Sequence, residues 1–139
     1  MGPALVPGDY LFVSKSPNAQ IERGDVGVYR FPPNPSQEFL HRVVAGPGDE
    51  IEIRAKRLIV NGATPDEPNV WHADSMTWAP AESPRDHFGP LTLAAGEYFV
   101  LGDNRDNAND SRFQGFIAED QIVGRMIYVF HVGRCDELE

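Results

Sequence analysis

The most informative stretch of this sequence is residues 102–116, which read GDNRDNANDSRFQGF. The stretch follows the run GEYFVL at 96–101, whose β-branched and aromatic residues are typical of a strand. It is itself rich in Asp, Asn and Arg, and the short polar side chains favour turns because they hydrogen-bond nearby backbone groups. We therefore expect a strand that opens into an ordered polar loop.

Runs with the composition of strands recur along the chain, with Gly or Pro between them, and this pattern predicts an all-β domain. The expected strands are 10–13, 26–31, 39–44, 50–53, 57–60, 96–101 and 122–130. The first three suggest a meander. The fourth and fifth suggest a two-stranded ribbon, and the dipeptide Asn61-Gly62 is a strong hairpin signal. The one helix that we expect is a single turn near 118–120.

The length of 139 residues, with 41% hydrophobic and 24% charged residues, fits a single globular domain, 1–139. Within it, residues 63–92 are rich in proline and show neither a helical nor a strand period. We expect an inserted subdomain of β-ribbon and loop at about 54–92, containing Trp71 and Trp78. These two rings either dip into a membrane interface or form the core of the subdomain.

Charge and composition exclude several classes of function. The net charge of −9 repels a phosphate backbone, so nucleic acid is not an expected partner. Cys135 is the single cysteine, so no internal disulfide forms, and no apolar run approaches the roughly 18 residues of a membrane-spanning helix. The histidines lack ligand-like spacing and the Asp/Asn-rich loop lacks the glycine and glutamate of a calcium loop, so neither a metal nor another cofactor is expected.

Four segments, taken in order, resemble the conserved boxes of the type I signal peptidases, or leader peptidases, of the S26 serine protease family. Residues 1–13 (MGPALVPGDYLFV) are similar to the family's Ser-Met-x-Pro-Thr-Leu-x-x-Gly-Asp segment, and 23–26 (RGDV) match a weaker second box. Residues 41–49 (HRVVAGPGD) resemble the Lys-Arg-Val-x-Gly-x-Pro-Gly-Asp box, and 102–112 are the most specific match. The resemblance spans most of the chain and implies a signal-peptidase-like fold of mostly antiparallel sheets.

The resemblance also implies a function: a serine endopeptidase, anchored in the cell membrane by an N-terminal segment, with its catalytic domain on the extracytoplasmic side. Such an enzyme removes signal peptides from exported preproteins after Ala-x-Ala sites and binds them as an added β-strand. The family's nucleophilic serine would directly precede Met1. Without that serine and the anchor, the chain as given is expected to be inactive.

Two positions depart from the bacterial pattern of the family. His41 takes the place of the lysine that serves as general base, and Ala108 takes the place of a serine that helps to hold that lysine. An imidazole ordinarily titrates near pH 6.5 and needs no burial to serve as a base, so we expect His41 to be the general base. Asp110, or otherwise Asp103, is expected to orient it as the carboxylate of a serine–histidine–aspartate arrangement.

The resemblance implies further site residues. Those expected to line the substrate groove are Met1, Pro3, Leu5, Phe39 and Leu40. Those expected to brace the sheet as a salt-bridged loop are Gly102, Asp103, Asn104, Arg105, Asp110, Ser111 and Arg112.

One alternative stays open and a second is disfavoured. The chain could be a catalytically inactive homologue that binds secreted or pilin-like proteins as an assembly factor, and a native serine before Met1 would favour the protease instead. A self-cleaving repressor or a conjugation peptidase would share the catalytic fold, but the complete 102–112 motif argues against both.

Overall fold

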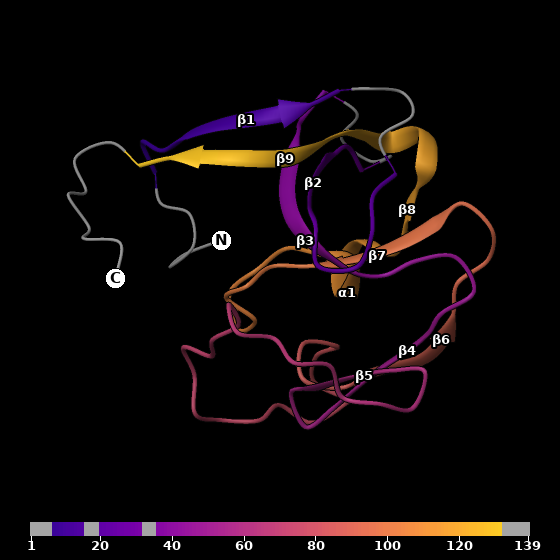
Figure 1. Ribbon diagram of the computed structural model, residues 1–139. Helices are drawn as coiled ribbons and strands as arrows, with labels where there is room; N and C mark the ends of the chain where they lie inside the picture. The colour runs from indigo at the N-terminus through magenta and orange to yellow at the C-terminus, as the bar shows by residue number, and fades with distance from the viewer. Residues whose placement is uncertain (1–6, 16–19, 32–35, 132–139) are drawn as a thin grey trace.

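A computed structural model of the chain describes residues 7–15, 20–31 and 36–131 (Figure 1). The strands of these residues are β1 (Tyr10–Ser14), β2 (Val26–Tyr29), β3 (Phe39–Ala45), β4 (Glu50–Arg54), β5 (Arg57–Val60), β6 (Phe88–Thr92), β7 (Glu97–Leu101), β8 (Ile117–Ala118) and β9 (Ile122–Phe130). The helical elements are α1 (Ser111–Gln114) and a 3₁₀ turn, η1 (Glu119–Gln121). Every strand pair within the two sheets is antiparallel, which confirms the expected all-β fold with little helix.

The larger sheet has the strand order β1-β9-β2-β3-β7-β8, so the expected meander of the first three strands is wrong. β9 separates β1 from β2, so of these three strands β2 and β3 are the two that pair with each other. β9 is nine residues long and pairs with two strands. Its first part pairs with β2 and its second part with β1. β1 and the end of β9 project together as an arm beside the rest of the sheet (Figure 1).

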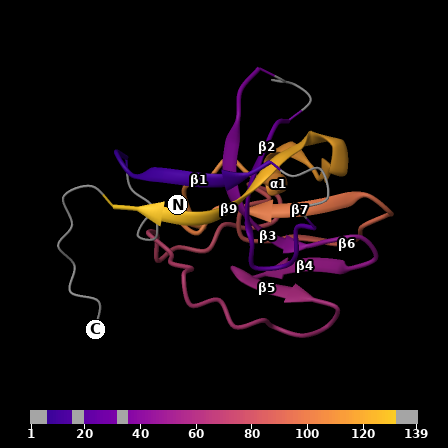
Figure 2. The same cartoon turned by 45° about the horizontal axis from the view of Figure 1, so that its top comes forward.

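The smaller sheet has the order β5-β4-β6 and lies beside β3 and β7 (Figure 2). The expected ribbon of β4 and β5 is present, but its turn is formed by Ala55 and Lys56, both with positive φ, and not by Asn61-Gly62, which turns the chain after β5. The backbone of Lys56 donates to the carbonyl of Asp86, and its Nζ contacts Asp106. Tertiary contacts therefore fix a turn that the local sequence does not favour.

Residues 61–87 connect β5 to β6 and contribute no strand to either sheet. They are attached to the polar loop after β7, since Trp71 forms a parallel bridge with Asn104. In addition, Oδ2 of Asp106 accepts a hydrogen bond of 2.6 Å from the backbone of Asp74. The 61–87 segment is therefore attached to the loop 102–112, the part of the chain that matches the family motif most specifically.

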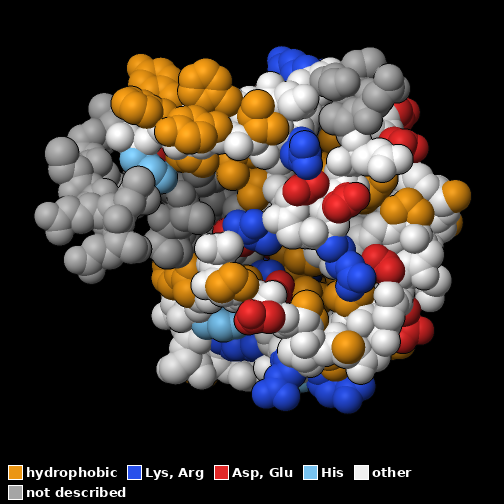
Figure 3. All heavy atoms as spheres, viewed as in Figure 1, with side chains coloured by type: hydrophobic (Ala, Val, Ile, Leu, Met, Phe, Trp, Pro, Cys, Tyr) orange, Lys and Arg blue, Asp and Glu red, His pale blue; other side chains and the backbone are white. Residues whose placement is uncertain are grey.

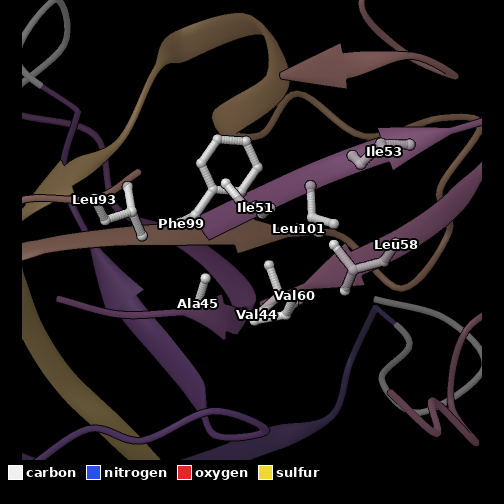
Figure 4. Packing of buried hydrophobic residues seen from close by; sticks show 9 residues of the cluster. All are labelled: Val44, Ala45, Ile51, Ile53, Leu58, Val60, Leu93, Phe99 and Leu101. Carbon is white, nitrogen blue, oxygen red and sulfur yellow. The ribbon is translucent and has the colours of Figure 1, made fainter. Parts of the chain in front are cut away.

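Two hydrophobic clusters fix the strands that carry the candidate site. The first lies between the two sheets and consists of Val44, Ala45, Ile51, Ile53, Leu58, Val60, Leu93, Phe99 and Leu101 (Figure 4). The second lies within the larger sheet and consists of Ile21, Tyr29, Phe31, Val43, Val100 and Ile117. Each fully buried large side chain contributes about 1.5–3 kcal/mol to the stability of the fold. Because β3 and β7 supply residues to both clusters, both strands are fixed on their two faces.

Candidate active site

His41 lies in the middle of β3, opposite Gly27 of β2, with its ring half-buried. Its Nδ1 is hydrogen-bonded to the hydroxyl of Tyr29, and the two ring centroids are 5.7 Å apart. Burial among these rings lowers the pKa of His41 to about 4, although the negative charge of Asp110 acts in the opposite direction. His41 is therefore a neutral imidazole at neutral pH.

The Nε2 side of the His41 ring faces the start of the loop after β7. A methyl group placed on Gly102 would lie 3.5 Å from Cδ2 and 3.7 Å from Nε2 of His41, and 2.5 Å from Cβ of Ala108. Gly102 is therefore required by close packing. The structure brings together the two positions at which the sequence departs from the bacterial pattern, His41 and Ala108.

Asp110 is fully buried and is the N-cap of α1. Its carboxylate accepts hydrogen bonds from Nε and Nη2 of Arg112, at 2.9 and 2.8 Å, and from the backbone N–H of Gly102 at 3.1 Å. The group that meets Nδ1 of His41 is the Tyr29 hydroxyl and not this carboxylate. Asp110 acts on His41 through its charge, and its orienting role stays a prediction.

Asp103, which is buried, forms a second ion pair with Arg42, the residue after His41. Both of its oxygens accept from Arg42, each at 2.9 Å, and the hydrogen bond raises the pKa of the guanidinium. Nη1 of Arg42 donates in turn to the carbonyl of Gly24. These contacts join β3 to the polar loop and to the turn before β2.

The rest of the loop makes equally specific contacts. Arg105 donates to the carbonyl of Gly102 at 2.9 Å and pairs with Glu67 at 2.6 Å. The hydroxyl of Ser111 accepts from the backbone of Val100 at 3.0 Å. All of the loop residues chosen from the sequence are buried except Asn104, which is half-buried. The contacts of this loop extend to β3, β7 and residues 61–87.

An open groove of about 480 Å³ lies between β1 and β3. It is lined by Leu11, Val13, Lys15, Val28, Glu38, Phe39 and Leu40. Phe39 and Leu40 were expected here, while Met1, Pro3 and Leu5 lie outside the described residues. Leu11, Val13 and Val28 were not expected in a groove, although alternation along β1 places the first two on one face.

Tyr29 contacts His41 and was not predicted from the sequence. Within the run 26–31 a tyrosine looks like any strand residue that packs in a core, and only the pairing of β2 with β3 places it beside the imidazole.

The described residues contain no group of three or more His, Cys, Asp or Glu side chains arranged to hold a metal ion. No helix among them is long and apolar enough to cross a membrane.

The antiparallel fold with little helix is the fold that the resemblance to the type I signal peptidases implies. The family described as "Signal peptidase, peptidase S26" matches residues 1–131, and this chain belongs to that family. The chain is 36% identical over 133 residues to signal peptidase I of Bacillus amyloliquefaciens, covering 94% of this chain and 68% of that protein. It is 34% identical over 140 residues to signal peptidase IB of Staphylococcus aureus, strain Mu50 / ATCC 700699, covering 94% and 72%.

A solved structure supports the same assignment. The crystal structure of a signal peptidase I from Enterococcus faecalis V583 superposes with a TM-score of 0.60 at 27% identity, covering 78% of this chain and 97% of that one.

Proposed function

We propose that this chain is the extracytoplasmic catalytic domain of a membrane-anchored signal peptidase I that uses a serine–histidine pair. It removes signal peptides from exported proteins after Ala-x-Ala-type sites. The observation that carries the proposal is the position of His41: a neutral imidazole on β3 whose Nε2 side faces Gly102 and Ala108 of the family's most specific motif.

In this mechanism the nucleophile is the family's serine, which the resemblance puts directly before Met1. Its hydroxyl attacks the scissile carbonyl while His41 takes the hydroxyl proton and later returns it to the leaving amine. The lowered pKa of His41 keeps the imidazole neutral, and therefore able to accept a proton, at any pH above about 5. The carboxylate of Asp110 favours the imidazolium that forms, because its charge raises the pKa of His41.

The substrate binds as an extended strand along the groove between β1 and β3. The apolar lining by Leu11, Val28 and Leu40 suits the small aliphatic side chains of an Ala-x-Ala site, and backbone pairing to a strand edge makes the affinity independent of most other side chains. Met1, Pro3 and Leu5 would complete the groove beside the nucleophile.

The test restores the native residues upstream of Met1, including any serine, and measures cleavage of a peptide that contains an Ala-x-Ala site. Cleavage is expected at the predicted bond, and His41→Ala should lower kcat/KM by at least 100-fold. The matched control is His87→Ala, which removes an imidazole from the loop before β6. Binding without cleavage by the extended chain would favour the inactive assembly factor instead.

We also propose that the arm of β1 and β9 contacts the membrane surface. Tyr10, Phe12, Tyr128 and Phe130 are 66%, 56%, 59% and 53% exposed, and they form cross-strand pairs along the arm. Figure 3 shows hydrophobic side chains gathered over β1 and β9. Exposed aromatic clusters of this kind are favoured at a lipid interface, whereas a net charge of −9 gives no attraction to anionic lipid.

Cosedimentation with phosphatidylcholine vesicles tests this contact. The double substitution Phe12→Ser and Tyr128→Ser should abolish most of the binding, while Phe116→Ser, at an exposed phenylalanine outside the arm, should leave it unchanged. Equal binding of all three proteins would contradict the proposal.

A further inference from the structure

Tyr29 is a buried residue that contacts the proposed base and has no part in the mechanism above. It is 0% exposed, and its ring packs against Phe31 and Phe39 with centroids 5.0 and 6.0 Å away. Its hydroxyl is hydrogen-bonded to Nδ1 of His41. Among the described residues, the structure gives this hydroxyl no other hydrogen-bond partner.

The proton of this hydrogen bond can be assigned by counting donors and acceptors. Burial and the nearby charge of Asp110 raise the pKa of the Tyr29 hydroxyl above its ordinary value, so the hydroxyl keeps its proton. A buried hydroxyl proton is costly when it is left without an acceptor. The acceptor within reach is Nδ1 of His41. A neutral imidazole has one donor and one acceptor nitrogen, so accepting at Nδ1 requires the ring proton to be on Nε2.

We propose that the Tyr29 hydroxyl donates to Nδ1 and holds the resting His41 as the tautomer that carries its proton on Nε2. Tyr29 is thus a positioning residue, which fixes both the ring and its tautomer. The net contribution of one hydrogen bond corresponds to a roughly two- to twelvefold preference for this tautomer.

The consequence for catalysis rests on the function proposed above. With its proton on Nε2, the imidazole presents a donor and not a lone pair on the side of Gly102 and Ala108. The proposed mechanism needs the lone pair on Nε2, because Nδ1 is occupied by the Tyr29 hydroxyl. His41 is then competent only in the fraction of molecules in which the proton has moved to Nδ1 and the Tyr29 hydroxyl has turned to accept it. The resting site is therefore held below its full activity.

The charged groups around His41 do not replace this hydrogen bond. Asp110 and Asp103 favour the protonated imidazole and Arg112 disfavours it, but their polar atoms are engaged with one another, with Arg42 or with the backbone. They influence how readily His41 takes up a second proton. The choice between the two neutral tautomers falls to the group that touches a ring nitrogen, which is the Tyr29 hydroxyl.

The test is a two-bond ¹H–¹⁵N correlation spectrum of the ¹⁵N-labelled protein at pH 7–8, where His41 is neutral. The signals of His41 are identified by their loss in His41→Gln. The expected spectrum has a pyrrole-like Nε2 and a pyridine-like Nδ1. Tyr29→Phe keeps the ring packing and should reduce the tautomer preference several-fold. Tyr98→Phe, at a half-buried tyrosine of β7 for which the structure gives no contact with His41, should leave it unchanged.

A protonated Nδ1 in the unmodified protein would overturn the proposal, and so would an unchanged preference in Tyr29→Phe. If Tyr29→Phe does not fold, the spectrum of the unmodified protein still decides the tautomer. The measurement needs neither a nucleophile nor a substrate, so its failure is distinguishable from a failure of the proposed peptidase activity.

Discussion

Substitution of Asp110 by asparagine should strongly destabilise this protein. The Asp110 and Arg112 side chains are only 0% and 2% exposed, and the carboxylate oxygens receive two guanidinium and two backbone hydrogen bonds. Asparagine keeps the size and one acceptor oxygen but leaves the guanidinium of Arg112 buried without its counter-charge. Breaking a buried pair in this way costs about 3–5 kcal/mol. For a domain of this size, that loss lowers Tm by roughly 10–20 °C.

Urea denaturation measures the loss, with Glu52→Gln as the matched control. Glu52 also pairs with an arginine, Arg54, but the Arg54 side chain is 67% exposed, so the control should lose less than about 1 kcal/mol. The double substitution Asp110→Asn with Arg112→Gln should be less destabilising than the sum of the single ones. A loss below about 1 kcal/mol in Asp110→Asn, or strict additivity, would refute the conclusion that this pair braces the loop.

Three further predictions concern the base and the arm. Between pH 4 and 6.5 the unfolded chain binds a proton at His41 that the folded chain does not bind. The free energy of unfolding should therefore rise with pH over this range by up to about 3 kcal/mol. Urea titrations of His41→Gln should lack this increase. The double substitution His41→Lys with Ala108→Ser, made in the chain extended to include the upstream serine, should move the acidic limb of kcat/KM to higher pH. The reason is that an ammonium group ordinarily titrates near 10.4. An unchanged limb would argue against a base at this position. Gly124→Ala should cost about 1–3 kcal/mol in thermal denaturation, because its methyl group would lie 2.5 Å from the Ser14 carbonyl oxygen and 2.6 Å from Cγ1 of Val13, and an unchanged Tm would contradict this packing.

The strands were largely predictable because their apolar runs are short and bounded by Gly and Pro. β9 was expected at 122–130 and lies there, and the helical turn expected near 118–120 is the 3₁₀ turn η1. β6 was missed because Gly89 and Pro90 disfavour a strand interior, and it is an edge strand where proline is tolerated. The pairing of β1 with β9 joins the two ends of the chain, and no local pattern encodes it.

The candidate site was predictable where the motif itself supplies the residues. His41 and the loop 102–112 could be chosen from the sequence, and the structure brings His41, Gly102 and Ala108 together. The partner of Nδ1 could not be chosen, because Tyr29 is distant from His41 in sequence and resembles ordinary core. Asp110 was expected both in the salt-bridged loop and as the carboxylate that orients His41. Its oxygens bind the guanidinium of Arg112, and its orienting role stays a prediction.

The low pKa of His41 also lies beyond what the sequence predicts. From the residue type alone, His41 would titrate near pH 6.5. The enclosure by Tyr29 and the neighbouring strands removes water from the ring and lowers the pKa to about 4. The position of the acidic limb therefore distinguishes a base in this folded environment from a solvated histidine.

The proposed role of His41 as the general base is tested most directly by the pH dependence of kcat/KM. The reaction is cleavage of an Ala-x-Ala peptide by the chain extended to include the serine before Met1. We expect an acidic limb near pH 4 that reports protonation of His41, a plateau at neutral pH, and loss of cleavage in His41→Ala. Cleavage that persists in His41→Ala with the same acidic limb would contradict the assignment of His41 as the base.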